Sequence, residues 1–497
     1  MRKLKCNVVF ACALVISVVI ACIAILCPKT FKFISDNTFS YITTRFGWLY
    51  LIAMFGFVVF IIYIALSKYG NIRLGDSKPE YSNFSWFAML FCAGMGVGLV
   101  FWGISEPISH YINPGQGIES KSVDSIGFAF KSVFMHWGIH PWAAYCIVGL
   151  SLAYFQYKKG KSALISSTLE SLFKNQNMPK IIKNIVDVLA TFATIAGIVT
   201  SLGLGVMQIN SGLKYVFGIP YSQTVQVIII LVTSIVFVAS AVSGIEKGVK
   251  FLSNATLIMM LAIMVLCFCL GAKLEIVDNL IGGIGDYFQN FIGDSLCIST
   301  YKDSSWIINW RVFYWAWWIA WTPFVGIFIA RISRGRTIRE FICGVVLAPT
   351  VASIIWFSIF GTMGIHLAVD GTLSSNILDS IASNPEIGLF VVFAKYPFAI
   401  GTSIIAIVIL FSFFVTSADS GTYVLAMLSS NGNVNPSNKK KICWGLILSV
   451  MAVSLLFAGG LKALQTISIV AAFPFVIIMI ASCFSLVKDL RAEKKNG

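Results

Sequence analysis

Charged side chains are scarce in this sequence. Asp, Glu, Lys and Arg make up 11% of its 497 residues, against 58% hydrophobic residues, and the mean hydropathy is +0.85. A soluble protein carries about twice that share of charge on average. The composition therefore excludes a soluble globular protein and predicts a protein that lies in a lipid bilayer.

Cysteine, histidine and acid–base patterns that mark metal sites, disulfides or catalytic sites are also missing. Most of the twelve cysteines, such as Cys146, lie in apolar stretches where a small side chain packs well, and Cys297 stands alone in a loop. The four histidines show no metal-ligand spacing. Glu106, Lys131 and Asp187 are scattered toward the ends of apolar stretches, whereas an enzyme needs paired acid and base groups. We expect no disulfide framework, no cofactor and no enzymatic activity.

Long apolar runs dominate the chain instead. A helix needs about 20 residues to cross roughly 30 Å of hydrocarbon, and twelve stretches meet this length. The predicted spans are approximately Val8 to Cys27, Gly47 to Leu66, Trp86 to Ser105, Gly138 to Phe155, Val186 to Val206, Val225 to Ser243, Leu252 to Gly271, Val312 to Arg331, Ile342 to Thr362, Pro397 to Val415, Cys443 to Gly460, and Ile467 to Val487.

Lys and Arg concentrate in the N-terminus, in every second loop after it and at the C-terminus. Basic residues are held on the cytoplasmic side of a membrane, so both termini are expected in the cytoplasm. The same asymmetry explains most of the net charge of +15 without a nucleic acid partner. We expect a multi-pass protein of the cell membrane whose partner is the lipid bilayer.

The stretch AGMGVGLVFWG, residues 93–103, places three glycines inside the third predicted span. Gly94 and Gly98 are four residues apart and suit a small-residue face between packed helices. Gly96 lies on the opposite side of a helix, so packing explains only two of the three. A discontinuous helix explains all three, because unwound backbone at membrane depth is tolerated where it lines a cavity. Both interpretations remain open at this point.

Aromatic residues form two groups. The stretch WRVFYWAWWIAWTPF, residues 310–324, places four rings on one helix face: Tyr314, Trp317, Trp318 and Trp321. The fourth span, which Pro141 is expected to disrupt, carries three more on a broad side: Trp137, Trp142 and Tyr145. Such faces serve as core packing or as a binding wall. Aromatic faces attract quaternary ammonium groups, and each contact contributes about 0.5–2 kcal/mol.

Two adjacent hydroxyl groups occur in FFVTSADSG, residues 413–421, near the end of the tenth predicted span. Thr416 and Ser417 offer the hard oxygen donors that an alkali cation requires. The alternative is an ordinary hydrogen bond from each hydroxyl to a carbonyl of its own helix.

Together these stretches resemble the betaine/carnitine/choline transporter family, over nearly the whole chain. The matching residues are Gly94-Met95-Gly96-Val97-Gly98, Phe101-Trp102-Gly103, Glu106-Pro107, His136-Trp137-Gly138, His140-Pro141-Trp142, Trp317-Trp318, Trp321-Thr322-Pro323-Phe324, Ala330 to Thr337, and Thr416-Ser417-Ala418-Asp419-Ser420.

The resemblance implies an all-α integral membrane protein with twelve transmembrane helices. Two inverted five-helix repeats of the LeuT-like fold, residues 86–271 and 311–487, follow two extra N-terminal helices in residues 1–85. An external loop spans residues 272–310, and a short cytoplasmic tail spans residues 488–497. The resemblance also implies a homotrimer. Osmosensing members carry long charged tails, so gating through a tail is not expected here.

The resemblance also implies a substrate site and an ion site. The rings of Trp137, Trp142, Tyr145, Trp317, Trp318 and Trp321 would hold a trimethylammonium group, and the backbone at Met95 with Gly94, Gly96 and Gly98 would approach the substrate carboxylate. Sodium would be bound by backbone carbonyl groups of Cys92, Met95 and Phe413 and by the hydroxyl groups of Thr416 and Ser417. A second ion is expected near Phe324 and Thr200-Ser201.

The favoured function is sodium symport of glycine betaine or a similar compatible solute by alternating access. Gly98 stands where choline carriers of the family tend to have an acidic residue, which favours a zwitterion. Residues 253–271 lack the Lys or Arg with which the family's sodium-independent exchangers replace sodium. A carnitine/betaine exchanger and a proton-coupled choline carrier remain the alternatives. A channel is less favoured because it has no need of a closed aromatic cage.

Overall fold

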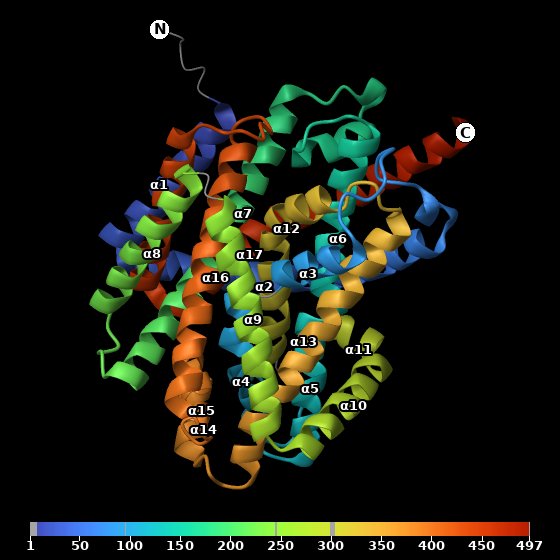
Figure 1. The fold of residues 1–497 in the computed structure, drawn as a ribbon. Helices are drawn as coiled ribbons and strands as arrows, with labels where there is room; N and C mark the ends of the chain where they lie inside the picture. Colours follow the sequence, from blue (N-terminus) through green and yellow to red (C-terminus); the bar gives the residue numbers. More distant parts are fainter. Residues whose placement is uncertain (1–6, 95, 244–245, 299–303, 497) are drawn as a thin grey trace.

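The computed structural model describes residues 7–94, 96–243, 246–298 and 304–496, with side chains for all of these except residues 91–94, 246–250 and 494–496. Helices account for most of this chain (Figure 1). The α-helices are α1 (Val8–Leu26), α2 (Pro28–Leu66), α3 (Asn83–Gly94), α4 (Val97–Ile112), α5 (Val123–Trp137), α6 (Ile139–Ala153), α7 (Lys180–Phe217), α8 (Gln223–Ser243), α9 (Glu246–Leu270), α10 (Lys273–Gln289), α11 (Phe291–Ser295), α12 (Phe313–Ile332), α13 (Ile338–Val369), α14 (Ser375–Ser383), α15 (Gly388–Phe393), α16 (Ala399–Leu428) and α17 (Asn438–Asn496). Shorter segments of 3-10 or π-helix are η1 (Lys68–Asn71), η2 (Tyr154–Lys158), η3 (Ile165–Leu172), η4 (Lys174–Gln176), η5 (Ile307–Val312) and η6 (Pro385–Ile387).

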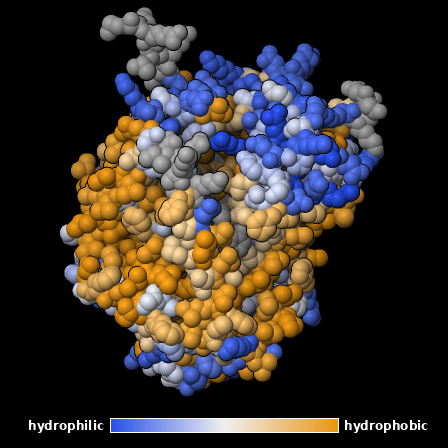
Figure 2. Space-filling view, viewed as in Figure 1, coloured by the Kyte–Doolittle hydropathy of each residue, from blue (hydrophilic) through white to orange (hydrophobic). Residues whose placement is uncertain are grey.

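The surface has the layering of a membrane protein. Figure 2 shows a broad hydrophobic belt between a large hydrophilic region at the top and a smaller one at the bottom. Large apolar side chains are exposed on this bundle, among them Leu66, Ile235 and Ile258. Within the described residues, ten helical segments are long and apolar enough to cross a membrane. An all-helical integral membrane protein is thus confirmed, whereas the count of twelve spans remains a prediction.

The third predicted span is broken, as the glycine pattern suggested. Helix α3 ends at Gly94 and α4 begins at Val97, and Gly96 between them is extended, with φ −142° and ψ −175°. Each half is shorter than a membrane span. The discontinuous helix is therefore confirmed, and the packing face alone is not sufficient to describe residues 93–103.

The fourth predicted span is wrong in one respect. The helical path breaks at Gly138, which has φ −92° and ψ −129°, and not at Pro141. Trp137 consequently ends α5, while Trp142 and Tyr145 lie on α6. Proline in the first turn of a helix lacks only an N–H group that would have no partner there. Pro141 therefore stays in the first turn of α6 without disrupting it.

The two last predicted spans lie within α17, on either side of a break in the helix. Helix α17 contains non-helical backbone at Gly459 and Gly460, the latter with φ +56°. This is where the eleventh predicted span ends. The centre of the bundle is formed where α17 packs on α7, α12 packs on α6, and α16 packs on α7. Helices α10, α14 and α15 gather at the lower end in Figure 1.

Candidate functional site

A cavity of about 200 Å³ lies between the discontinuous helix and the bundle. Its walls come from the start of α4, the junction of α5 and α6, and from α7, α9, α12, α13 and α16. The residues that line it include Gly96, Gly98, Trp137, Trp142, Tyr145, Ser201, Thr256, Trp317, Trp318, Trp321, Phe324, Phe413, Thr416 and Ser417. Residues separated by more than 300 positions in the sequence thus meet around one space, with room for a small solute.

The rings form a connected aromatic wall. Trp318 packs edge-on against Trp137 with centroids 4.9 Å apart, and against Tyr145 at 6.1 Å. Trp317 stacks on Trp318 with an interplanar angle of 13°. Trp142 in turn meets Tyr145 edge-on at 5.3 Å. The six predicted rings therefore include five joined by direct ring contacts, and the cage is defined here by those five: Trp137, Trp142, Tyr145, Trp317 and Trp318.

Hydrogen bonds fix the orientation of two indole rings on α12, those of Trp318 and Trp321. Trp318 donates through Nε1 to the carbonyl oxygen of His136 at 2.8 Å. Trp321 donates to the carbonyl oxygen of Gly197 at 2.8 Å and contacts Phe324 edge-on, so it extends the wall along α12. A buried indole N–H that has a partner leaves its ring face free to contact a ligand.

Gly98 permits the close approach of α4 to the rings. A Cβ atom at this position would lie 2.6 Å from Trp317 and 3.0 Å from Trp137. At Gly96, by contrast, a Cβ atom would meet nothing within 4 Å. Any side chain at position 98 would therefore displace two rings of the wall.

Hydroxyl groups also line the cavity. Thr416 and Ser417 on α16 lie beside the cavity, as do Ser201 on α7 and Thr256 on α9. Thr416 donates its hydroxyl to the carbonyl oxygen of Ser412 at 2.9 Å, which is the local bond considered as the alternative to an ion. The hydroxyl oxygen keeps lone pairs when it donates, so this bond is compatible with a cation ligand.

None of the described residues that line the cavity carries a charge. Helix α4 starts at its wall, with Gly96, Val97 and Gly98 facing the space. The first N–H groups of a helix have no partner within it and attract anions. The cavity therefore combines ring faces suited to a cation with a helix start suited to a carboxylate.

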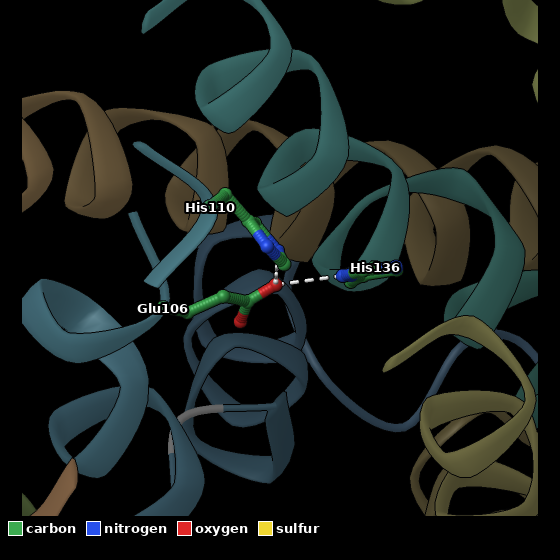
Figure 3. A group of neighbouring side chains, drawn as sticks. All are labelled: Glu106, His110 and His136. Carbon is green, nitrogen blue, oxygen red and sulfur yellow. Dashed lines mark hydrogen bonds and ion pairs between the residues drawn. The ribbon is translucent and has the colours of Figure 1, made fainter. Parts of the chain in front are cut away.

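A second cluster lies behind the aromatic wall. Figure 3 shows His110 and His136 directed at the carboxylate of Glu106, and all three are fully buried. Oε1 of Glu106 lies 2.6 Å from Nδ1 of His136 and 3.3 Å from Nε2 of His110. Oε2 accepts from Nε1 of Trp137 at 2.8 Å and from the hydroxyl of Tyr314.

Sequence spacing of the histidines did not predict this cluster. The three ligand atoms lie within 4.8 Å of one another, close enough to share a metal ion. The sequence places two members of the cluster together, because Glu106 and His110 are four residues apart on α4. His136 joins them only through the packing of α5 on α4. The hydrogen bonds of Glu106 account for its acceptor positions without an ion.

The other predicted site residues are placed as follows. Gly94 ends α3, Met95 lies outside the described residues, and the side chain of Cys92 does too. The backbone ligands predicted at Cys92 and Met95 thus stay predictions. Thr200 turns its hydroxyl away from the cavity, toward Ser468 and the carbonyl oxygen of Leu464 on α17, so only Ser201 of that pair faces the cavity.

A discontinuous helix beside a small cavity in a membrane bundle defines a carrier of small solutes. Residues 8–495 match the family model described as "BCCT, betaine/carnitine/choline family transporter". The chain belongs to this family, and the protein is a multi-pass membrane transporter rather than an enzyme.

Similar proteins cover nearly the whole chain. It is 43% identical over 477 residues to the "Glycine betaine transporter OpuD" of Bacillus subtilis, which covers 95% of this chain and 92% of that protein. It is 44% identical over 471 residues to a "Probable glycine betaine transporter" of Desulfitobacterium hafniense, covering 94% of each. An "Ectoine/hydroxyectoine transporter" of Virgibacillus pantothenticus is 42% identical over 473 residues, covering 94% of this chain and 93% of that protein.

Proposed function

We propose that this protein imports glycine betaine or a closely similar zwitterion together with sodium. One observation carries the proposal, namely that five aromatic rings and the hydroxyl groups of Thr416 and Ser417 line the same uncharged cavity. Relatives named as glycine betaine transporters support the choice of substrate. The relative named as an ectoine/hydroxyectoine transporter makes ectoine-like zwitterions the second candidate.

The cavity suits the two ends of glycine betaine. The trimethylammonium group would lie against the faces of Trp137, Trp318 and Tyr145, where a desolvated cation gains about 2 kcal/mol or more from ring contacts. The carboxylate would lie at the start of α4, near Gly96 and Gly98. A solute with no net charge suits a cavity with uncharged walls. The rings would compensate its cationic group and the start of α4 its carboxylate, so neither charge would be buried without a partner.

Sodium would bind between α16, which carries the two hydroxyl groups, and the end of α3, where the discontinuous helix breaks. Thr416 and Ser417 would supply hydroxyl oxygens from α16, and the carbonyl group of Phe413 would add a third oxygen, together with the carbonyl groups predicted from the sequence at Cys92 and Met95. A cation shared by α3 and α16 would favour the arrangement of the discontinuous helix that binds substrate. This is the physical basis for coupling.

The same proposal includes the transport cycle and its setting. Twelve spans arranged as two inverted five-helix repeats would allow alternating access around the cavity. The concentration of Lys and Arg in alternate loops supports cytoplasmic termini. Assembly as a homotrimer rests on family resemblance.

Uptake of labelled glycine betaine into proteoliposomes tests the proposal directly. We expect uptake that requires an inward sodium gradient and does not respond to carnitine loaded inside the vesicles. Uptake that requires internal carnitine and ignores sodium would instead establish an exchanger. Uptake that follows a proton gradient in the absence of sodium would establish the proton-coupled alternative.

The ion site has its own test. The double substitution Thr416→Ala with Ser417→Ala removes both hydroxyl ligands, so we expect sodium activation of uptake to be lost. Thr402→Ala is the matched control, because Thr402 lies on the same helix and bonds only to backbone at the other end of α16. Unchanged sodium activation in the double variant would place the ion elsewhere.

A further inference from the structure

Glu106 is a buried carboxylate that does not line the cavity, yet it contacts the cavity wall from behind. It lies on α4 with none of its side chain exposed. Its Oε2 accepts the indole N–H of Trp137, which is one of the cage rings. Trp137 therefore has a ligand-facing side and a side anchored to a carboxylate.

Four groups converge on the two oxygens of Glu106. Trp137 and Tyr314 meet Oε2, while His136 and His110 meet Oε1. A carboxylate has about four acceptor positions and no donor, so an ionised Glu106 matches these four groups one for one. Indole N–H groups only donate, which fixes the direction of the bond from Trp137.

The tautomer of His110 follows from a further indole. Nε1 of Trp306 lies 3.3 Å from Nδ1 of His110 and can only donate, so Nδ1 accepts. The proton of a neutral His110 is then on Nε2, directed at Glu106. His136 stacks on Tyr314 with an interplanar angle of 11°, and this stacking holds its Nδ1 toward the same carboxylate.

Nearby basic side chains are engaged elsewhere. Lys131 pairs with Asp294 at 3.0 Å, and buried Arg311 donates to the carbonyl oxygen of Asp294 and lies over the ring of Trp306. Neither one contacts Glu106. The carboxylate is therefore held by hydrogen bonds from uncharged or weakly basic groups, and no Lys or Arg of the described residues forms an ion pair with it.

The Glu106 cluster also supports Trp318, a second ring of the cage. Trp318 donates to the backbone carbonyl of His136, whose side chain binds Glu106. Both rings that meet edge-on at 4.9 Å thus depend on the Glu106–His136 pair for their hydrogen bonds.

We propose that Glu106 is a positioning residue for the aromatic cage, which fixes the ring of Trp137 through the in-plane N–H bond and places a negative charge at the edge of that ring. The charge favours a cation against the ring face, so Glu106 contributes to the preference for a quaternary ammonium group. This inference rests on the proposed function, in which the cage binds that group.

Equilibrium binding of labelled glycine betaine to the full-length protein tests this role. We expect Glu106→Gln to raise the Kd by about tenfold or more, because it removes the charge and replaces an acceptor with a donor. In proteoliposomes the same variant should raise the KM for uptake while the maximal rate changes by less than about threefold. An unchanged Kd, or a fall in maximal rate with unchanged KM, would overturn the proposal.

The effect of Glu106→Gln on binding in two variant backgrounds distinguishes a positioning role from a general loss of structure. In a Trp137→Phe background, which lacks the indole N–H, Glu106→Gln should weaken binding by less than it does in the wild type, because the bond to Trp137 is already absent. In a Trp142→Phe background, where the altered ring has no contact with Glu106, the full effect of Glu106→Gln should return. Equal effects in the two backgrounds would contradict a role through Trp137.

Three controls keep the outcomes distinct. Glu386→Gln alters another buried carboxylate, which accepts from Tyr221 and does not line the cavity, and should bind like the wild type. If Glu106→Gln does not fold, Tyr314→Phe still removes one bond to the carboxylate while keeping its ring, and wild-type affinity there would overturn the proposal. Undiminished binding by Trp318→Ala would reject the cage itself, and with it the role of Glu106.

Discussion

At the scale of single residues, the absence of a side chain at position 98 determines the shape of the cavity. Two rings from different helices, Trp137 and Trp317, occupy the volume that a Cβ atom at Gly98 would need. The glycine pattern predicted a special role for this position, and the structure supplies the reason. Which rings would press against it depends on contacts between α4, α5 and α12, and no local pattern contains that information.

Gly98→Ala should weaken substrate binding by about tenfold, because overpacking by a single methyl group costs roughly 1–3 kcal/mol. Gly96→Ala adds the same methyl group where nothing lies within 4 Å, so a smaller loss is expected. Binding of labelled glycine betaine to both variants measures the difference. A larger loss for Gly96→Ala would show that the rings are not the sensitive wall.

Residue types were sufficient to predict which rings line the cavity but not which groups support those rings. The rings were identified from their types and helical spacing. The hydrogen bonds of Glu106 could not be predicted in this way, because its partners Trp137 and Tyr314 are 31 and 208 positions away in the sequence. A carboxylate within an apolar stretch was the available signal, since buried charge requires partners.

At the scale of helices, two breaks surround the cavity. One separates α3 from α4 and the other separates α5 from α6 at Gly138. Three alternating glycines predicted the first. The second was assigned to Pro141 because proline is the stronger general signal, but a proline in a first turn leaves no hydrogen bond unmade.

The third break, in α17, gives a testable prediction. Gly460 has φ +56° and ψ −134°, a conformation that costs an L-residue about 1–3 kcal/mol, so Gly460→Ala should lower the thermal unfolding midpoint by several degrees. Gly282→Ala on α10 is the matched control, since its Cβ atom would meet nothing within 4 Å at an ordinary φ. Equal midpoints for the two variants would mean that α17 can straighten at no cost.

At the scale of the whole molecule, hydropathy alone was sufficient to predict a helical membrane protein. The exposed apolar belt in Figure 2 is the three-dimensional form of the long apolar runs. Ten long apolar segments appear among the described residues where twelve spans were predicted, because each half of the broken helix α3–α4 is shorter than one span and α17 holds two predicted spans.

Ion pairs outside the belt connect the ends of helices. Glu170 on η3 binds Lys161 at 2.8 Å and Lys183 at the start of α7. Burial acts to raise the pKa of Glu170, but the hydrogen bonds and charges of the two lysines outweigh it and lower the pKa below its usual value. An acid with a lowered pKa stabilises the fold above its ordinary pKa, and this contribution is lost as the pH falls through the lowered value.

Glu170→Gln should therefore lower the unfolding midpoint slightly at pH 7, and the gap to the wild type should close on acidification. The effect is small because partly exposed ion pairs contribute about 0.2–1 kcal/mol each. Thermal unfolding between pH 7 and pH 3 measures it. Asp76→Asn, which removes a 93% exposed partner of Lys158, should leave the midpoint unchanged, and a gap that widens in acid would contradict the assignment to Glu170.

The uncharged cavity has a consequence for electrical measurements. If its walls contribute no charge and the solute is a zwitterion, the only net charge carried through the protein in a cycle is that of the coupling ions. The ratio of membrane current to labelled solute taken up then counts the charges of the coupling ions per solute directly, and a cationic substrate such as choline would add one elementary charge to that ratio.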